Sequence, residues 1–267
     1  GETMPDGWGG SYVPKLLSSL SHLYGKAGNM SESYAVSPPD ADEEAVLGVA
    51  AWEAVLGVTQ LTTYALSTMF DTAAHARFNP VIGRLMWGCT RGVHVADVAV
   101  LLPEAALWSQ YAPPTLNFAH YRQENAGANA IDRAWIDVGE TLLASQRDFD
   151  YVTEELLQAG TVSAGRWSVG GERFRVLILP RALMLRRQTA EAISRFVEGG
   201  GKVIAVGALT ERWIEEGSEM AAQQWTGTLF REVPHPGGGQ AIFQADIDAG
   251  LLQALDGWLP ADLAWEP

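Results

Sequence analysis

Apolar residues in the first third of the chain recur at spacings of three and four, between short stretches rich in β-branched residues. In residues 11–24 this period places Val13, Leu16, Leu20 and Leu23 on one helical face. By the same reading, helices are predicted over 11–24, 43–56 and 78–91, and strands over 29–36 and 58–66. The order helix–strand–helix–strand, joined by short Gly or Pro turns, is typical of a parallel α/β fold.

The rest of the chain contains runs that are almost entirely apolar, such as Arg175–Leu179 and Lys202–Val206. Such runs are typical of strands that a parallel sheet buries on both faces. Further strands are predicted over 95–102 and 150–152, a hairpin over 167–174, and helices over 130–146 and 187–198. This pattern predicts an open, doubly wound α/β domain. We place the domain boundary near Gly92, which gives domains 1–92 and 93–267. From Ala208 onward the pattern is irregular.

Composition and charge narrow the classes of function. The chain has 267 residues, of which 47% are hydrophobic and 19% charged, as expected of a packed globular protein. Its 18 Lys and Arg against 32 Asp and Glu give a formal net charge of −14. This sign disfavours phosphate backbones and anionic lipid surfaces, so we expect neither nucleic acid nor a membrane as a partner. The single cysteine, Cys89, excludes a disulfide within this chain and a Cys-rich metal site.

Carboxylates at the ends of predicted strands are the first candidates for chemistry. Glu32 lies in Ser-Glu-Ser-Tyr, where a short strand gives way to a loop, and Glu2 precedes the first helix in the equivalent place one unit earlier. Active sites of (β/α) barrels are built at the carboxyl ends of the strands, where paired carboxylates act as acid, base or nucleophile. The alternative, that both are solvated loop acids, stays open.

Aromatic and histidine side chains are candidates for contact with a sugar, because sugar rings stack on aromatic faces. Trp8, in a glycine-rich loop beside the suspected site, is the best stacking candidate, and Tyr64 is taken with it as substrate-binding. His22 on the first helix is a third candidate, although a hydrogen-bonded structural role fits it as well. Trp52 and Trp87 lie on predicted helices and are expected in the core.

The spacing of potential ligands does not indicate a transition-metal site. No second histidine lies at metal-ligand spacing from His22, and the sequence contains no His-Glu-x-x-His pattern, so no metal ligand is assigned. Calcium stays compatible with the sequence, because scattered carboxylates and carbonyls suffice to bind it.

The second domain lacks a nucleophile where a similar fold carries one. Class I glutamine amidotransferases have a cysteine at a sharp turn after a central strand, but here the corresponding strand is followed by Pro180-Arg181-Ala182. The chain also has no Gly-x-Ser-x-Gly elbow. Cys89 lies on an apolar helix, where we expect it to fill core space. Gly199-Gly200-Gly201-Lys202 follows a helix and precedes a strand, the opposite order from a phosphate loop, so no nucleotide site is predicted.

Several short motifs resemble large bacterial α-L-rhamnosidase-type glycosidases, glycoside hydrolase family 106 and its relatives. The stretch 14–26 (PKLLSSLSHLYGK), followed by Ser-Glu-Ser-Tyr, looks like their late barrel strands. Residues 79–85 (NPVIGRL) resemble one of their barrel helices, and residues 93–103 (VHVADVAVLLP) are similar to the strand that opens the next domain. The resemblance covers most of residues 1–207, and the order of the motifs is distinctive.

The resemblance implies a partial (β/α) barrel followed by a flavodoxin-like domain, similar to class I glutamine amidotransferases but without their nucleophile. It implies hydrolysis of terminal, rhamnose-type sugars from poly- or oligosaccharides, with Glu32 as general base or nucleophile. Glu2 would be the partner acid, or a metal or sugar ligand. Because the resemblance begins late in the barrel, we expect this chain to be the C-terminal part of a longer enzyme and inactive by itself. The family is usually exported, which implies a periplasmic or secreted parent protein.

The sequence is also compatible with two other functions. One is a non-catalytic carbohydrate-binding or oligomerisation module with an amidotransferase-like fold; an open barrel edge would favour a homo-oligomer. The other is an amidotransferase-like enzyme that uses Cys89.

Overall fold

The computed structural model describes residues 10–34, 42–63, 70–111, 125–215, 219–231, 233, 235–247 and 249–263. The chain divides into two compact units, Gly1–His94 (unit 1) and Val95–Pro267 (unit 2), close to the boundary suggested at Gly92. Among the described residues, no helix is both long enough and apolar enough to span a membrane.

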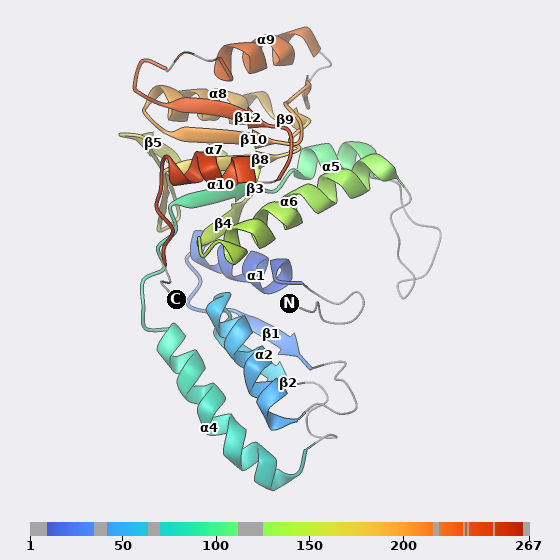
Figure 1. The fold of residues 1–267 in the computed structure, drawn as a ribbon, viewed down its shortest axis with the longest axis vertical. Coiled ribbons are helices and arrows are strands. Elements are labelled where there is room, and N and C mark those ends of the chain that lie inside the picture. The colour runs from blue at the N-terminus through green and yellow to red at the C-terminus, as the bar shows by residue number, and fades with distance from the viewer. Residues whose placement is uncertain are drawn as a thin grey trace. The chain divides into compact units, whose positions relative to one another are not determined.

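Unit 1 contains a parallel pair of strands joined by a helix (Figure 1). Its elements are α1 (Tyr12–Leu23), β1 (Met30–Ser33), α2 (Glu43–Val55), β2 (Gln60–Thr63) and α4 (Thr72–Cys89). Strands β1 and β2 pair in register, with Met30 opposite Gln60 and Ser33 opposite Thr63. Helix α2 connects them and packs against α4. This strand–helix–strand arrangement is the repeating unit of a (β/α) barrel.

Carboxylate caps determine where the two longer helices of unit 1 begin. Asp42 Oδ1 accepts a hydrogen bond from the Ala45 N–H at 2.9 Å, and Asp71 Oδ1 accepts one from the Ala74 N–H at 2.8 Å. The cap at Asp71 starts α4 well before Phe78, the start predicted from the apolar pattern, because the capped first turns carry small and polar residues rather than an apolar stripe.

The core of unit 1 lies between α2, α4 and the end of β1. Val46, Ala74 and Phe78 form a buried cluster, and partly buried side chains pack against it: Tyr34, Leu47, Phe70 and Ile82. The expectation that Trp52 and Trp87 belong to the core is wrong, since they are 37% and 62% exposed. Both lie on helix faces that the described residues leave uncovered, and an apolar residue on a helix does not by itself show which face packs.

Unit 2 is built on a five-stranded parallel sheet. The strands of this sheet are β3 (Val98–Leu101), β4 (Phe149–Val152), β8 (Val176–Pro180), β10 (Lys202–Val206) and β12 (Gln240–Gln244). The helices are α5 (Glu104–Gln110), α6 (Ala126–Ala144), α7 (Glu154–Ala159), α8 (Arg187–Glu198), α9 (Glu219–Leu229) and α10 (Ala249–Asp256). A three-stranded antiparallel sheet contains β5 (Thr161–Ser163), β6 (Arg166–Val169) and β7 (Glu172–Phe174), and a short pair contains β9 (Met184–Leu185) and β11 (Arg212–Trp213).

The strand order of the main sheet is β12-β10-β8-β3-β4. Numbered one to five along the chain and read from β4, these strands give the flavodoxin-like order 2-1-3-4-5. All residues of β3, β4 and β8 are buried, because helices pack on the sheet: α6 against β3 and β8, and α8 against β10 (Figure 1). The order reverses between β3 and β8. The carboxyl ends of these two strands therefore flank the topological switch point, where such sheets usually bind ligands.

Candidate active site

Glu32 lies one residue before the end of β1, on the exposed side of the strand. Side chains alternate along a strand, so Met30 and Glu32 share one face while Ser31 and Ser33 share the other. Met30 and Glu32 are exposed, whereas Ser33 is buried. The residue opposite Glu32 on β2 is Thr62, which is also exposed. The carboxyl end of the parallel pair thus presents a carboxylate beside a hydroxyl, at the end of the strands where barrels carry their chemistry.

The other face of β1 is held to α2 by a buried carboxylate, Glu53, that the sequence pattern does not indicate. Ser33 Oγ donates to both carboxylate oxygens of Glu53, at 2.8 and 2.9 Å, and Ser31 Oγ lies 3.4 Å from Glu53 Oε1. The two serine hydroxyls are 3.0 Å apart. Glu53 is only 7% exposed, and this burial raises its pKa above the usual range of a carboxyl, while the serine hydrogen bonds act in the opposite direction. The serines on either side of Glu32 are therefore held by one acid.

The chain turns sharply immediately after β1. Tyr34 has a φ of 64°, in the left-handed region that non-glycine residues seldom adopt, and its hydroxyl donates to the Val46 carbonyl at 2.9 Å. Burial, and next the charge of Glu53, raise the pKa of Tyr34, so its phenol stays protonated at neutral pH. The turn and the hydrogen bond together fix where β1 ends and hence where Glu32 stands.

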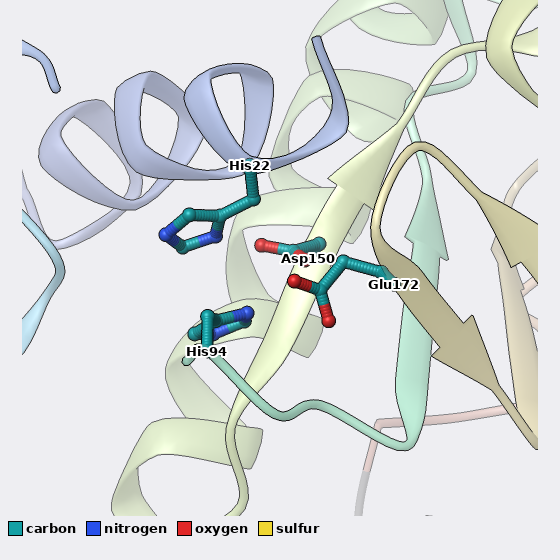
Figure 2. A group of neighbouring side chains, drawn as sticks. All are labelled: His22, His94, Asp150 and Glu172. Atoms are coloured by element: carbon teal, nitrogen blue, oxygen red, sulfur yellow. The ribbon is translucent and has the colours of Figure 1, made fainter. Parts of the chain in front are cut away.

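Three of the other predicted site residues, Glu2, Trp8 and Tyr64, lie outside the described residues. The fourth, His22, lies half-buried on α1 and stacks on His94, as Figure 2 shows. The two ring centroids are 3.9 Å apart and the ring planes are inclined by 20°. The sequence gives no sign of this pair, because the two histidines lie far apart along the chain. Alone, the pair offers two imidazole ligands, fewer than the three or so protein ligands of a zinc site.

Figure 2 also shows Asp150 on β4 and Glu172 on β7, two buried acids of unit 2. A carboxylate oxygen of one lies within 4.8 Å of a carboxylate oxygen of the other. Carboxylate oxygens suit calcium, but calcium takes about six to eight ligands, so these two acids by themselves do not define a calcium site.

At the switch point of unit 2, Arg181 occupies the sharp turn after β8. Its φ is 41°, and its Nη1 donates to the Gly207 carbonyl at 3.1 Å, at the end of β10. A guanidinium binds anions but does not attack a carbonyl carbon, so the turn carries no nucleophile. Cys89 lies in unit 1 as the last residue of α4 and is exposed, so the expectation that it fills core space is wrong.

Two acids near this end of the sheet, Glu154 and Glu104, have raised pKa values, and hydrogen bonds give Glu154 a structural role. Glu154 is buried and accepts hydrogen bonds from the Arg186 N–H at 2.8 Å and from Thr189 Oγ1 at 2.7 Å, which ties α7 to the start of α8. Burial raises the pKa of Glu154. Burial, and next the charge of Glu154, also raise the pKa of Glu104 at the start of α5.

No protein-family description matches the chain, and no curated protein matches its sequence. Among solved structures, a rhamnosidase from Novosphingobium sp. PP1Y aligns with a TM-score of 0.61 and 18% identity, over 92% of this chain and 24% of its own. A GH42 β-galactosidase from G. stearothermophilus aligns with a TM-score of 0.48 and 12% identity, over 76% of this chain and 31% of its own. An α-L-fucosidase isoenzyme 2 from Paenibacillus thiaminolyticus aligns with a TM-score of 0.43 and 20% identity, over 75% of this chain and 28% of its own.

At these identities the likeness concerns the fold. It confirms the α/β class and the partial barrel followed by a doubly wound sheet, which the strand order of unit 2 also shows. The chain spans about a quarter of the length of the rhamnosidase that it matches.

Proposed function

We propose that this chain is the C-terminal part of a glycoside hydrolase. It would contain the late strands of the barrel and the domain that follows the barrel. The parent protein would release terminal, rhamnose-type sugars from oligo- or polysaccharides. The observation that carries the proposal is the place of Glu32. It is an exposed carboxylate at the carboxyl end of a parallel strand, in a fold that a rhamnosidase matches over 92% of this chain.

Glycoside hydrolysis needs two carboxyl groups with different tasks. In this proposal Glu32 either removes a proton from the attacking water or attacks the anomeric carbon itself. Glu2 is the partner that protonates the departing oxygen, or a metal or sugar ligand. Which of the two routes applies depends on the separation of the carboxyl groups, about 5 Å for attack by the enzyme and more for attack by water.

The surroundings of Glu32 suit this role. The serine–Glu53 hydrogen bonds lie on the opposite face of β1, so they hold the strand without occupying the exposed face. Thr62 stands beside Glu32 and offers a hydroxyl to a sugar. We also propose that Trp8, Tyr64 and His22 contact the sugar. A periplasmic or secreted location and a homo-oligomer are further parts of the proposal.

The test is turnover by the complete gene product, with an aryl α-L-rhamnoside as substrate and matching fucoside and galactoside controls. Glu32→Gln should lower kcat by about a hundredfold or more, since positioned acids and bases contribute roughly that much. The control is Glu44→Gln, which changes an exposed acid on α2 and should leave turnover unchanged. Both variants should melt at the wild-type temperature, because neither carboxylate is buried.

The possible outcomes test three parts of the proposal: the sugar, the role of Glu32 and the class of protein. Cleavage of the fucoside or galactoside but not the rhamnoside would keep the class of enzyme and overturn the sugar. Wild-type turnover by Glu32→Gln would overturn the assigned role of Glu32. No cleavage of any of the three would favour the alternative, a non-catalytic carbohydrate-binding or oligomerisation module.

The amidotransferase alternative is disfavoured by one observation, the guanidinium of Arg181 at the turn after β8. It would regain support only if alkylation of Cys89 abolished a glutamine-dependent activity.

A further inference from the structure

A hollow of about 470 Å³ opens between α8 and α9 in unit 2. One wall is a face of α8, on which residues three to four positions apart lie side by side: Arg187, Ala190, Glu191, Ser194 and Arg195. The other wall contains Trp213 of β11 together with Ala221 and Trp225 of α9. The volume lies in the range of small-ligand sites, and the two alanines leave the space that larger side chains would fill.

The two indoles of the hollow are held in fixed positions. Trp213 is 5% exposed, and its ring centroid lies 5.4 Å from that of Trp225 at an angle of 64°. Trp225 Nε1 donates to Ser194 Oγ at 2.9 Å, and Ser194 Oγ donates in turn to the Ala190 carbonyl at 3.1 Å. This chain of bonds ties the partly exposed Trp225 ring to α8. A rigid aromatic wall costs a ligand little ordering entropy on binding.

The residues that line the hollow carry more positive than negative charge, unlike the chain as a whole. Two arginines and one acid line it, whereas the chain carries a formal net charge of −14. Arg187 and Arg195 are exposed, and within the described residues neither guanidinium forms an ion pair. The Arg187 backbone N–H donates to Glu215 Oε2 at 3.0 Å, which fixes the first turn of α8 beside the hollow. Two available guanidinium groups next to an indole suit a ligand with both an apolar ring face and a carboxylate.

We propose that this hollow binds an acidic oligosaccharide, one that contains uronate residues. A pyranose ring packs on Trp225, its carboxylate pairs with Arg195 or Arg187, and Glu191 accepts hydrogen bonds from ring hydroxyls. The site lies within unit 2 and uses neither Glu32 nor Glu2. Binding at this hollow is a separate property from the proposed hydrolysis, and each of the two proposals can be tested without the other.

The experiment is isothermal titration of this chain with trigalacturonate, with maltotriose as the neutral control. We expect trigalacturonate to bind in preference to maltotriose, and its affinity to fall as salt is raised. The double variant Arg187→Gln/Arg195→Gln should weaken binding by about tenfold or more, since it removes two charge-assisted contacts from an exposed helix face. Arg133→Gln on α6 is the matched control: it removes an exposed arginine that pairs with Asp137 and should leave the affinity unchanged.

A second variant tests the hollow itself. Ala221→Leu fills the space without altering charge and should also weaken binding, which excludes a general effect of net charge. The proposal is overturned if trigalacturonate fails to bind at millimolar concentration, if maltotriose binds equally well, or if the double arginine variant binds like the wild type. Turnover of the complete gene product plays no part in these readouts, so failure here and failure of the hydrolase proposal are distinguishable.

Discussion

Asn29 and Thr59 join the starts of the two strands of unit 1 through three reciprocal hydrogen bonds. The Thr59 hydroxyl accepts from the Asn29 N–H at 2.8 Å and donates to the Asn29 carbonyl at 2.8 Å. The Asn29 side-chain oxygen accepts from the Thr59 N–H at 3.2 Å, and Asn29 Nδ2 donates to the Gly57 carbonyl at 2.9 Å. This arrangement immediately precedes the first paired residues of β1 and β2, so it fixes the register that places Glu32 opposite Thr62.

Replacing Thr59 by valine should therefore destabilise the protein while keeping the shape of the side chain. The substitution leaves the backbone groups of the buried Asn29 without their partner, which costs about 1–3 kcal/mol of unfolding free energy. Denaturant unfolding followed by circular dichroism measures the change. Thr63→Val, at an exposed position on the same strand, should stay within about 0.5 kcal/mol of the wild type. Equal losses in both variants would show that the hydrogen bonds do not stabilise the strand pair.

Glu53 predicts a pH dependence with a definite sign. Burial raises the pKa of Glu53 in the folded chain. A carboxyl of this kind favours folding most below its unfolded pKa, and the contribution is lost as pH rises through the folded value. Glu53→Gln keeps an oxygen that can accept from Ser33 but cannot ionise. Its stability relative to the wild type should therefore increase as pH rises from about 4 to about 8.

Thermal melts across this pH range measure the relative stability. Glu44→Gln changes an exposed acid of the same helix and should track the wild type at every pH. A stability of Glu53→Gln relative to the wild type that stays constant, or falls as pH rises, would contradict the assignment.

The regular parts of the fold were predictable because their patterns are unambiguous. Strand β10 is continuously apolar after Lys202, and α8 carries its buried residues at helical spacing, so both elements occur at the predicted bounds. Strand β12, at one edge of the sheet, was missed because its residues do not form an apolar run. Only Ala241 in it is buried, so it lacks the apolar run that indicates a central strand.

In the candidate site, too, some residues have a clear sequence pattern and others do not. The position of Glu32 near the end of a strand could be predicted, because a short strand and its end are visible in the sequence. Glu53 could not, because its partners Ser31 and Ser33 lie on another element and the sequence around it reads as ordinary helix. Cys89 was misplaced for a related reason: the spacing of a helix does not show which of its faces the fold leaves exposed.

The exposure of Cys89 makes its own prediction. An exposed thiol reacts with Ellman's reagent in the native state, whereas a buried one reacts only after unfolding. We expect about one equivalent of thiol per chain to react without denaturant, and none in Cys89→Ser. Alkylation should leave the melting temperature unchanged, because the added group points into solvent. A reaction that requires denaturant would contradict the exposed position at the end of α4.

Gly139 on α6 and Gly227 on α9 predict opposite effects of one substitution. A methyl group at Gly139 would overlap the Tyr151 hydroxyl oxygen on β4 and lie 3.1 Å from Phe149 Cζ, so Gly139→Ala should destabilise by about 1–3 kcal/mol. A methyl group at Gly227 meets nothing within 4 Å, so Gly227→Ala should stabilise by about 0.5–1 kcal/mol through reduced backbone entropy of the unfolded chain. Denaturant unfolding of both variants measures the difference.

Adding Tyr151→Phe to Gly139→Ala identifies the atom responsible. Removal of the hydroxyl opens the space that the new methyl group needs, although it also removes the Tyr151 hydrogen bond to the Trp135 carbonyl at 3.4 Å. We expect the double variant to be more stable than Gly139→Ala alone, which is a coupling between the two positions. Purely additive losses would show that α6 does not approach the sheet through this glycine.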